Sequence, residues 1–206
     1  MASSTHTFIP ALGTFWPIQL YEAAIWLGVP EKKIRMYLVQ RIDQYPLLDF
    51  GCGTGTFLAL LQQQTPAGII RGLDPDPYMI EKCHQKQLVV DRYEGGPLPY
   101  ENASFGTVTS TWVFQHFSEE ECLHYLREIR RILRGNGVFW LGDWGPSSAL
   151  LQRISERLVT WLDPAQNNFG PSERWPALLE KAGFSDIAPE WTTKTHLGTF
   201  YYWKCS

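Results

Sequence analysis

A nine-residue stretch, LLDFGCGTG at positions 47–55, decides the fold of this 206-residue chain. Its apolar beginning, residues 47–50, is typical of a short strand buried inside a sheet. Three glycines follow in a GxGxG spacing, and residues 56–61 then have the apolar pattern of a helix. Glycines permit a tight turn and let a ligand approach the backbone, while the N–H groups at the helix start face that ligand. The stretch therefore predicts a strand, a ligand-binding turn and a helix.

Strands alternate with helices along the rest of the chain, which predicts an α/β fold with a parallel sheet and helices on both faces. A capping box of Ser118 and Glu121 and an apolar stripe predict a helix over 118–134, with Gly135 as its left-handed end. We expect further strands at 69–73, 88–90, 105–110 and 138–141, with one or two more within 187–203, and further helices at 77–84, 150–161 and 176–182.

The length indicates a single domain, at about 150 residues per domain. Within it we expect an N-terminal helical cover at 1–44, a ligand-binding core at 45–145, and C-terminal helices with the last strands at 146–206. The net charge of −3 leaves no basic excess for a phosphate backbone, so nucleic acid is not an expected partner. No apolar run approaches about 18 residues, so membrane insertion is not expected either.

Cysteine usage and aromatic content bear on the location and the ligand. Cys52, Cys83, Cys122 and Cys205 form no CxxC pair, and their spacing suits neither zinc nor a disulfide framework. Because the N-terminus also lacks the pattern of a signal peptide, we expect a reduced, cytoplasmic protein without a metal. Nine Trp, nine Tyr and eleven Phe residues are enough to line both a core and a pocket for an apolar or aromatic ligand.

The carboxylates near the turn distinguish between two nucleotide ligands. Asp74 follows the turn by about 20 residues, at the end of the second expected strand, where a carboxylate binds a ribose diol. A nicotinamide dinucleotide favours GxGxxG, whereas Thr56 stands here at the last place of that pattern. Asp49 at the mouth of the turn would repel a pyrophosphate but suits the ammonium of a bound amino acid. The pattern favours a nucleoside joined to an amino acid over a dinucleotide.

On these residues the chain resembles the class I S-adenosylmethionine-dependent methyltransferases, in particular the type 11, UbiE-like small-molecule subgroup. The resemblance runs from about Leu47 to the C-terminus and implies a Rossmann-like, doubly wound, seven-stranded and mostly parallel sheet. The similar segments are DFGCGTG at 49–55, LDPDP at 73–77, LPY…SF within 98–105 and REIRRILRGNG at 127–137. Segments 112–117, 142–145 and 168–170 resemble the subgroup more narrowly.

The resemblance implies a role for individual residues toward S-adenosylmethionine and its product S-adenosylhomocysteine. Residues near the methionine part would be Asp49, Gly51, Cys52 and Gly53. Asp74 would bind the ribose hydroxyls. Residues around the adenine would be Pro75, Met79, Glu94 and Gly95, and Thr111 would lie near the methyl group. The sequence departs from the family pattern at Phe105-Gly106, which lacks an Asp, at Glu94, where Asp is commoner, and at 115–117, which reads QHF.

Ligands of a doubly wound sheet lie at the carboxyl ends of its strands, so the loop after the fourth strand borders the reaction. His116 is the first candidate for a general base, because an imidazole titrates near neutral pH, and Tyr21 in the N-terminal cover is the second. Each also suits a purely structural role, in a hydrogen bond or in a core. Candidate substrate contacts are Trp16, Trp112, Gln115, Trp144 and Asn168, with Asp143 and Asn167 beside them.

The resulting hypothesis is methyl transfer to a small, hydrophobic or aromatic metabolite. Three alternatives stay open: a dehydrogenase on the same sheet, a methyltransferase-like protein that serves as a partner subunit, and an enzyme that uses the cofactor for a reaction other than methylation. The sequence leaves the acceptor atom (oxygen, nitrogen, carbon or sulfur) and the choice between monomer and homodimer undecided.

Overall fold

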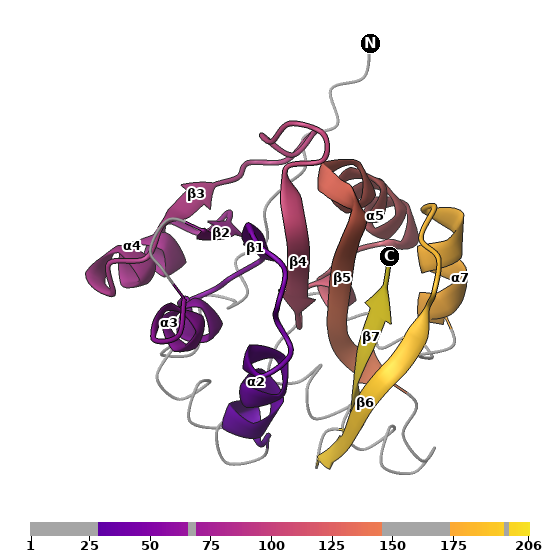
Figure 1. Cartoon of the computed structure of the whole chain (residues 1–206), viewed down its shortest axis with the longest axis horizontal. Coiled ribbons are helices and arrows are strands. Elements are labelled where there is room, and N and C mark those ends of the chain that lie inside the picture. The colour runs from indigo at the N-terminus through magenta and orange to yellow at the C-terminus, as the bar shows by residue number, and fades with distance from the viewer. Residues whose placement is uncertain (1–28, 66–68, 146–173, 196–197) are drawn as a thin grey trace.

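The computed structural model describes residues 29–65, 69–145, 174–195 and 198–206, which form one seven-stranded sheet (Figure 1). The strand order is β3-β2-β1-β4-β5-β7-β6. Strands β1 to β5 run parallel to one another, and β7 runs antiparallel to both β5 and β6. The predicted doubly wound α/β fold is therefore confirmed. The strands span Leu47–Phe50 (β1), Ile70–Asp74 (β2), Val90–Arg92 (β3), Phe105–Thr111 (β4), Leu133–Gly145 (β5), Ala188–Thr195 (β6) and Gly198–Cys205 (β7).

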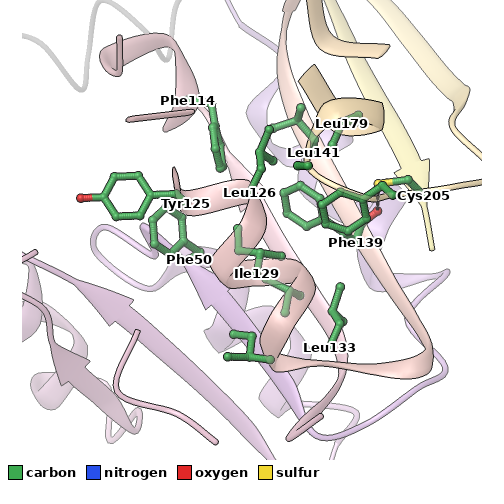
Figure 2. Packing of buried hydrophobic residues seen from close by; sticks show 14 of the residues in the cluster. Phe50, Phe114, Tyr125, Leu126, Ile129, Leu133, Phe139, Leu141, Leu179 and Cys205 are labelled. Atoms are coloured by element: carbon green, nitrogen blue, oxygen red, sulfur yellow. Dashed lines mark hydrogen bonds between the residues drawn. The ribbon is translucent and has the colours of Figure 1, made fainter. Parts of the chain in front are cut away.

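Helices cover both faces of the sheet, and each face has its own apolar core. One core joins buried residues of α2, α3 and α4 to the sheet, and the other joins those of α5 and α7. Figure 2 shows the second core, in which Leu126 and Ile129 of α5 lie near Phe139 and Leu141 of β5. The helices span Glu31–Val39 (α2), Thr56–Gln62 (α3), Pro77–Gln85 (α4), Glu119–Ile132 (α5) and Arg174–Lys181 (α7), with a 3-10 turn η1 at Phe114–His116.

The capping box at the start of α5 is confirmed, whereas the predicted end of this helix is wrong. Ser118 and Glu121 hold each other's backbone N–H groups as predicted. The helix ends at Ile132, because Leu133 turns to an extended conformation (φ −73°, ψ 140°) and pairs with Phe105 of β4. Gly135 therefore lies within a strand that begins five residues before the expected Val138 and is not a left-handed helix end.

Strand β3 also begins later than predicted, at Val90 instead of Leu88. The reason lies in how α4 ends: Gln87 adopts a left-handed conformation (φ 60°), and the Leu88 N–H donates to the Cys83 carbonyl. Leu88 is buried beneath this turn and is not available for pairing with β2. The first 28 residues of the predicted N-terminal helical cover and the helix expected at 150–161 lie outside the described residues. Among the described residues, no helix is long and apolar enough to cross a membrane.

Candidate active site

The glycine-rich turn leaves β1 at the carboxyl edge of the sheet and leads into α3. Gly51, Gly53 and Gly55 all have positive φ, a conformation that side chains disfavour. A Cβ atom on Gly51 would collide with Val113, whereas one on Gly53 would meet nothing within 4 Å. The turn therefore packs tightly against the loop after β4 at Gly51 and exposes its backbone to open space at Gly53.

Asp74 at the end of β2 holds this turn in place. Its Oδ2 accepts the Gly53 N–H at 2.8 Å, and its Oδ1 accepts the Asp76 N–H at 3.0 Å. Burial raises the pKa of Asp74, and the two backbone hydrogen bonds oppose that rise. Each carboxylate oxygen has a second lone pair, so Asp74 keeps the capacity to accept hydroxyl donors from a ligand. The glycine-rich turn and the Asp74 segment, which were predicted to share a ligand, are thus connected directly by a hydrogen bond.

Asp49 lies in β1, beneath the mouth of the turn. Its Oδ1 accepts the Thr109 hydroxyl of β4 at 2.8 Å, and its side chain is buried. Burial raises the pKa of Asp49 to about 7, while the Thr109 hydrogen bond and the charge of Arg35 oppose the rise. A cationic ligand group beside Asp49 would favour the ionised carboxylate and lower this pKa.

Arg35 of α2 brings a positive charge to the same region. Its guanidinium lies 5.6 Å from the centre of the Trp112 ring, and its Nε donates to Glu31 at 2.7 Å. Burial raises the pKa of Asp49 and of Tyr202 in β7, and the charge of Arg35 opposes both rises. Arg35 therefore combines with Asp49 to place a donor-rich cation and a carboxylate near one another, which is the pairing that a bound amino acid requires.

Aromatic side chains stand at the ends of β4, β5 and β7. Trp112 follows β4 directly in a left-handed conformation (φ 61°), which is strained for a bulky residue. Its ring lies 6.3 Å from that of Trp144 and 5.3 Å from that of Phe200, and Trp144 in turn meets Phe200 edge to face at 5.9 Å. The predicted substrate contacts Trp112 and Trp144 are thus brought together, whereas Trp175 packs in the core against Phe114.

Beside these rings lies a group of polar side chains. Gln115 Nε2 is 3.3 Å from His116 Nε2, and the Asp143 Oδ1 accepts the Trp144 N–H at 2.7 Å. Asp143 is fully buried, and burial raises its pKa to about 7. Within the described part of the chain, the buried atoms Trp112 Nε1, Gln115 Oε1 and Asp143 Oδ2 have no hydrogen-bond partner. Buried polar atoms are normally paired, so these three strand-edge atoms are available to a ligand; among the described residues Arg174, Trp175, Tyr202 and Trp203 also bury one unpaired atom each.

The other predicted site residues either lie near the ends of β2, β3 and β4 or fall outside the described part of the chain. Pro75 and Met79 are partly buried at the start of α4, Gly95 lies in a left-handed turn after β3, and Thr111 ends β4. Glu94 is mostly exposed and forms an ion pair with Arg92 at 2.9 Å. Tyr21, Trp16, Asn167 and Asn168 lie outside the described residues.

Three contributors escaped the sequence reasoning, namely Arg35, Thr109 and Tyr202. In the sequence, Arg35 looks like the partner of Glu31 on an amphipathic helix, and Thr109 looks like one more residue of a buried strand. Only the packing of α2 beside the turn and the pairing of β1 with β4 reveal their positions.

This sheet order, with a glycine-rich turn after β1 and an acidic residue ending β2, defines a class I methyltransferase fold. The chain superposes on a methyltransferase structure from Thermotoga maritima with a TM-score of 0.74 at 20% identity, over 92% of this chain and 95% of that one. A second one, from Archaeoglobus fulgidus, gives 0.67 at 19% identity, over 85% and 78%. At these identities the likeness concerns the fold alone.

The sequence comparisons agree with the fold. Residues 48–141 match the family model of the methyltransferase domain. The chain is 32% identical over 110 residues to a malonyl-[acyl-carrier protein] O-methyltransferase of Herminiimonas arsenicoxydans, covering 52% of this chain and 41% of the relative. It is 34% identical over 139 residues to a demethylmenaquinone methyltransferase of Deinococcus radiodurans, covering 63% and 56%. The chain thus spans about half the length of these relatives. Residues 48–141 thus match a methyltransferase domain, and the likeness to the class I S-adenosylmethionine-dependent methyltransferases that the motifs predicted is confirmed over this part of the chain.

Proposed function

We propose that this protein transfers a methyl group from S-adenosylmethionine to a small, hydrophobic or aromatic metabolite by in-line displacement. The observation that carries the proposal is the joined arrangement of the glycine-rich turn, Asp74 and the aromatic wall of Trp112 and Trp144 at one edge of the sheet. A ligand that touches both parts must combine a ribose with a reactive end near the wall.

The residues on the cofactor side suit the chemistry of S-adenosylmethionine. Asp74 offers free lone pairs to the ribose diol, and the exposed backbone at Gly53 allows close approach. In this proposal Asp49 would accept the ammonium of the methionine part, and Arg35, whose charge acts on Asp49, would donate to its carboxylate. Pro75, Met79, Glu94 and Gly95 are assigned to the adenine, and Gly51, Cys52 and Thr111 to the region of the sulfur.

When bound, the cofactor supplies a methyl group on a positively charged sulfur. The leaving group is neutral, so the main task of the protein is to hold the acceptor in line. Trp112 and Trp144 would position an apolar or aromatic acceptor by its faces. His116 is the candidate to remove a proton if the acceptor carries one, and Gln115 and Asp143 would then orient the acceptor through their unpaired oxygens. Tyr21, Trp16 and Asn168 remain candidates for closing this site.

The test is incubation of the pure protein with methyl-labelled S-adenosylmethionine and a panel of small acceptors drawn from cell extract, followed by separation by mass. We expect label in a low-mass, apolar product. Cofactor binding without label in any fraction would instead support a partner subunit or a different use of the cofactor. Binding of NADH without binding of S-adenosylmethionine would support the dehydrogenase alternative.

A further inference from the structure

Two of the four cysteines, Cys52 and Cys83, lie close together at the glycine-rich turn. Cys52 belongs to the turn itself, and Cys83 comes from α4, 31 positions further along the chain. The Cys83 Sγ donates to the Gly53 carbonyl oxygen at 3.2 Å, and the Cys52 Sγ approaches the same oxygen at 3.8 Å. The two sulfur atoms thus share one acceptor, and the thiols interact with each other.

The surroundings of this pair favour reaction at Cys83. Its hydrogen bond with Cys52 lowers the pKa of Cys83, and the positive charge of Lys86 lowers it further. The Lys86 ammonium is fixed nearby, because its Nζ donates to the Thr54 carbonyl at 2.6 Å. The same shared hydrogen bond and burial raise the pKa of Cys52, so Cys83 is the more easily ionised thiol of the two.

The other two cysteines provide an internal comparison. Cys122 on α5 and Cys205 on β7 lie in the core on the opposite face of the sheet, and Figure 2 shows Cys205 among its apolar neighbours. Burial raises the pKa of both, and their thiols donate to the main-chain carbonyls of Phe114 and Phe139. All four thiols are buried, so the difference lies in pairing and local charge and not in exposure.

We propose that Cys52 and Cys83 form a redox modification site, in which a peroxide joins them by a disulfide that weakens cofactor binding. The Cys83 thiolate would attack hydrogen peroxide and break its O–O bond, giving a sulfenic acid and a hydroxide that takes up the proton released by the thiol and becomes one water molecule. The Cys52 thiol would then displace the hydroxyl as a second water and form the S–S bond. The peroxide accepts the two electrons that the thiols lose, and no other reactant is needed.

The consequence for binding follows from the position of Gly53. Its carbonyl loses both S–H donors in the disulfide, while its N–H is the group that Asp74 holds. The Cys52 Sγ also packs closely against Gly72, because a Cβ atom added to Gly72 would lie only 2.6 Å from the sulfur. Bringing the two sulfurs to bonding distance therefore moves the segment that faces the ligand. Because Gly53 opens onto free space, bound cofactor should in turn shield the pair from oxidation.

The experiment treats the cofactor-free protein with hydrogen peroxide and measures thiol count, intact mass and peptide map. We expect loss of two thiols, a mass decrease of two hydrogen atoms and a linked peptide containing Cys52 and Cys83. The affinity for S-adenosylhomocysteine should fall at least tenfold and recover after reduction, and prior addition of S-adenosylhomocysteine should slow the oxidation. The Cys83→Ala variant should form no disulfide, whereas the matched Cys122→Ala variant should behave as the wild type.

Three outcomes would overturn the proposal: no linked peptide in the wild type, equal oxidation of the Cys83→Ala variant, or a linked protein whose affinity is unchanged. The mass and thiol readouts need no methyl transfer, so failure of the proposed activity would leave this test intact. If Cys83→Ala does not fold, the peptide map of the wild type with and without S-adenosylhomocysteine decides the question.

Discussion

The cofactor side and the acceptor side of the site differ in how their buried polar atoms are paired. On the cofactor side, Asp74 binds two backbone N–H groups and Asp49 binds Thr109. On the acceptor side, Trp112, Gln115 and Asp143 each bury an atom that no described residue pairs. The fold thus holds the two carboxylates of the cofactor side through its own contacts, and, of the atoms that the structure describes, the Tyr202 hydroxyl is the unpaired one there, whereas the acceptor side has three unpaired polar atoms available to a ligand. Substitutions on the two sides should therefore affect different properties.

The largest expected effect on cofactor binding comes from Asp74→Ala on the cofactor side. The variant loses the ribose acceptor and both hydrogen bonds that hold the turn, each charge-assisted and worth about 1.5–3 kcal/mol. We expect the affinity for S-adenosylhomocysteine to fall on the order of 100-fold, by ~2–3 kcal/mol, as measured by calorimetry. Asp76→Ala, which removes only the cap of α4, is the matched control and should keep its affinity. Unchanged affinity in Asp74→Ala would refute its assignment.

Arg35→Met tests whether α2 belongs to the cofactor side. This change keeps the length and the packing of the side chain but removes the charge facing Asp49 and the donors offered to a carboxylate. We expect about tenfold weaker binding of S-adenosylhomocysteine, which is ~1.4 kcal/mol. Arg41→Met is the control, because Arg41 lies just beyond α2 and stacks on Tyr37 at 3.6 Å. Equal affinities of the two variants would place Arg35 outside the site.

Asp143→Asn tests how much folding stability the protein loses by burying the ionised carboxylate of Asp143 on the acceptor side. Burial raises the pKa of Asp143 from 3.8 to about 7, so between these pH values the folded protein keeps a proton that the unfolded chain releases. The stability from this group is complete below about pH 4 and is lost as the pH rises to about 7. Between pH 4 and pH 8 the stability of the variant relative to the wild type should therefore rise by on the order of 4 kcal/mol.

Urea unfolding of both proteins between pH 4 and pH 8 measures this difference. Asp49, whose pKa is also raised to about 7, is present in both proteins and cancels. The two stability curves should diverge as the pH rises from 4 to 7. Parallel curves would mean that the carboxyl of Asp143 stays ionised in the folded protein, because a partner offsets the free-energy cost of burying its charge.

The smallest expected effect on the cofactor belongs to His116→Ala. His116 lies in the η1 turn beside Gln115 on the acceptor side, so its loss should leave the affinity for S-adenosylhomocysteine within about twofold of the wild type. Once an acceptor has been identified by labelling, turnover of that acceptor should fall in the variant. Full turnover across the pH range would remove His116 as the base.

Local sequence patterns were sufficient to predict the glycine-rich turn and the start of α5, because interactions between residues close in sequence determine both. The glycine spacing and Asp74 predicted the joined turn, and Ser118 with Glu121 predicted the start of α5. The end of α5 was wrong because pairing of Leu133 with Phe105 outweighed the local preference at Gly135. Arg35 and Thr109 were missed because their roles depend on contacts between segments far apart in the chain, which no spacing encodes.

One titration tests the central claim that this edge of the sheet binds S-adenosylmethionine. The wild-type protein is titrated by calorimetry with S-adenosylhomocysteine and, separately, with NADH. The arrangement of Gly53, Asp74, Asp49 and Arg35 predicts saturable one-site binding of S-adenosylhomocysteine and none of NADH. Binding of NADH alone, or of neither compound, would contradict the account.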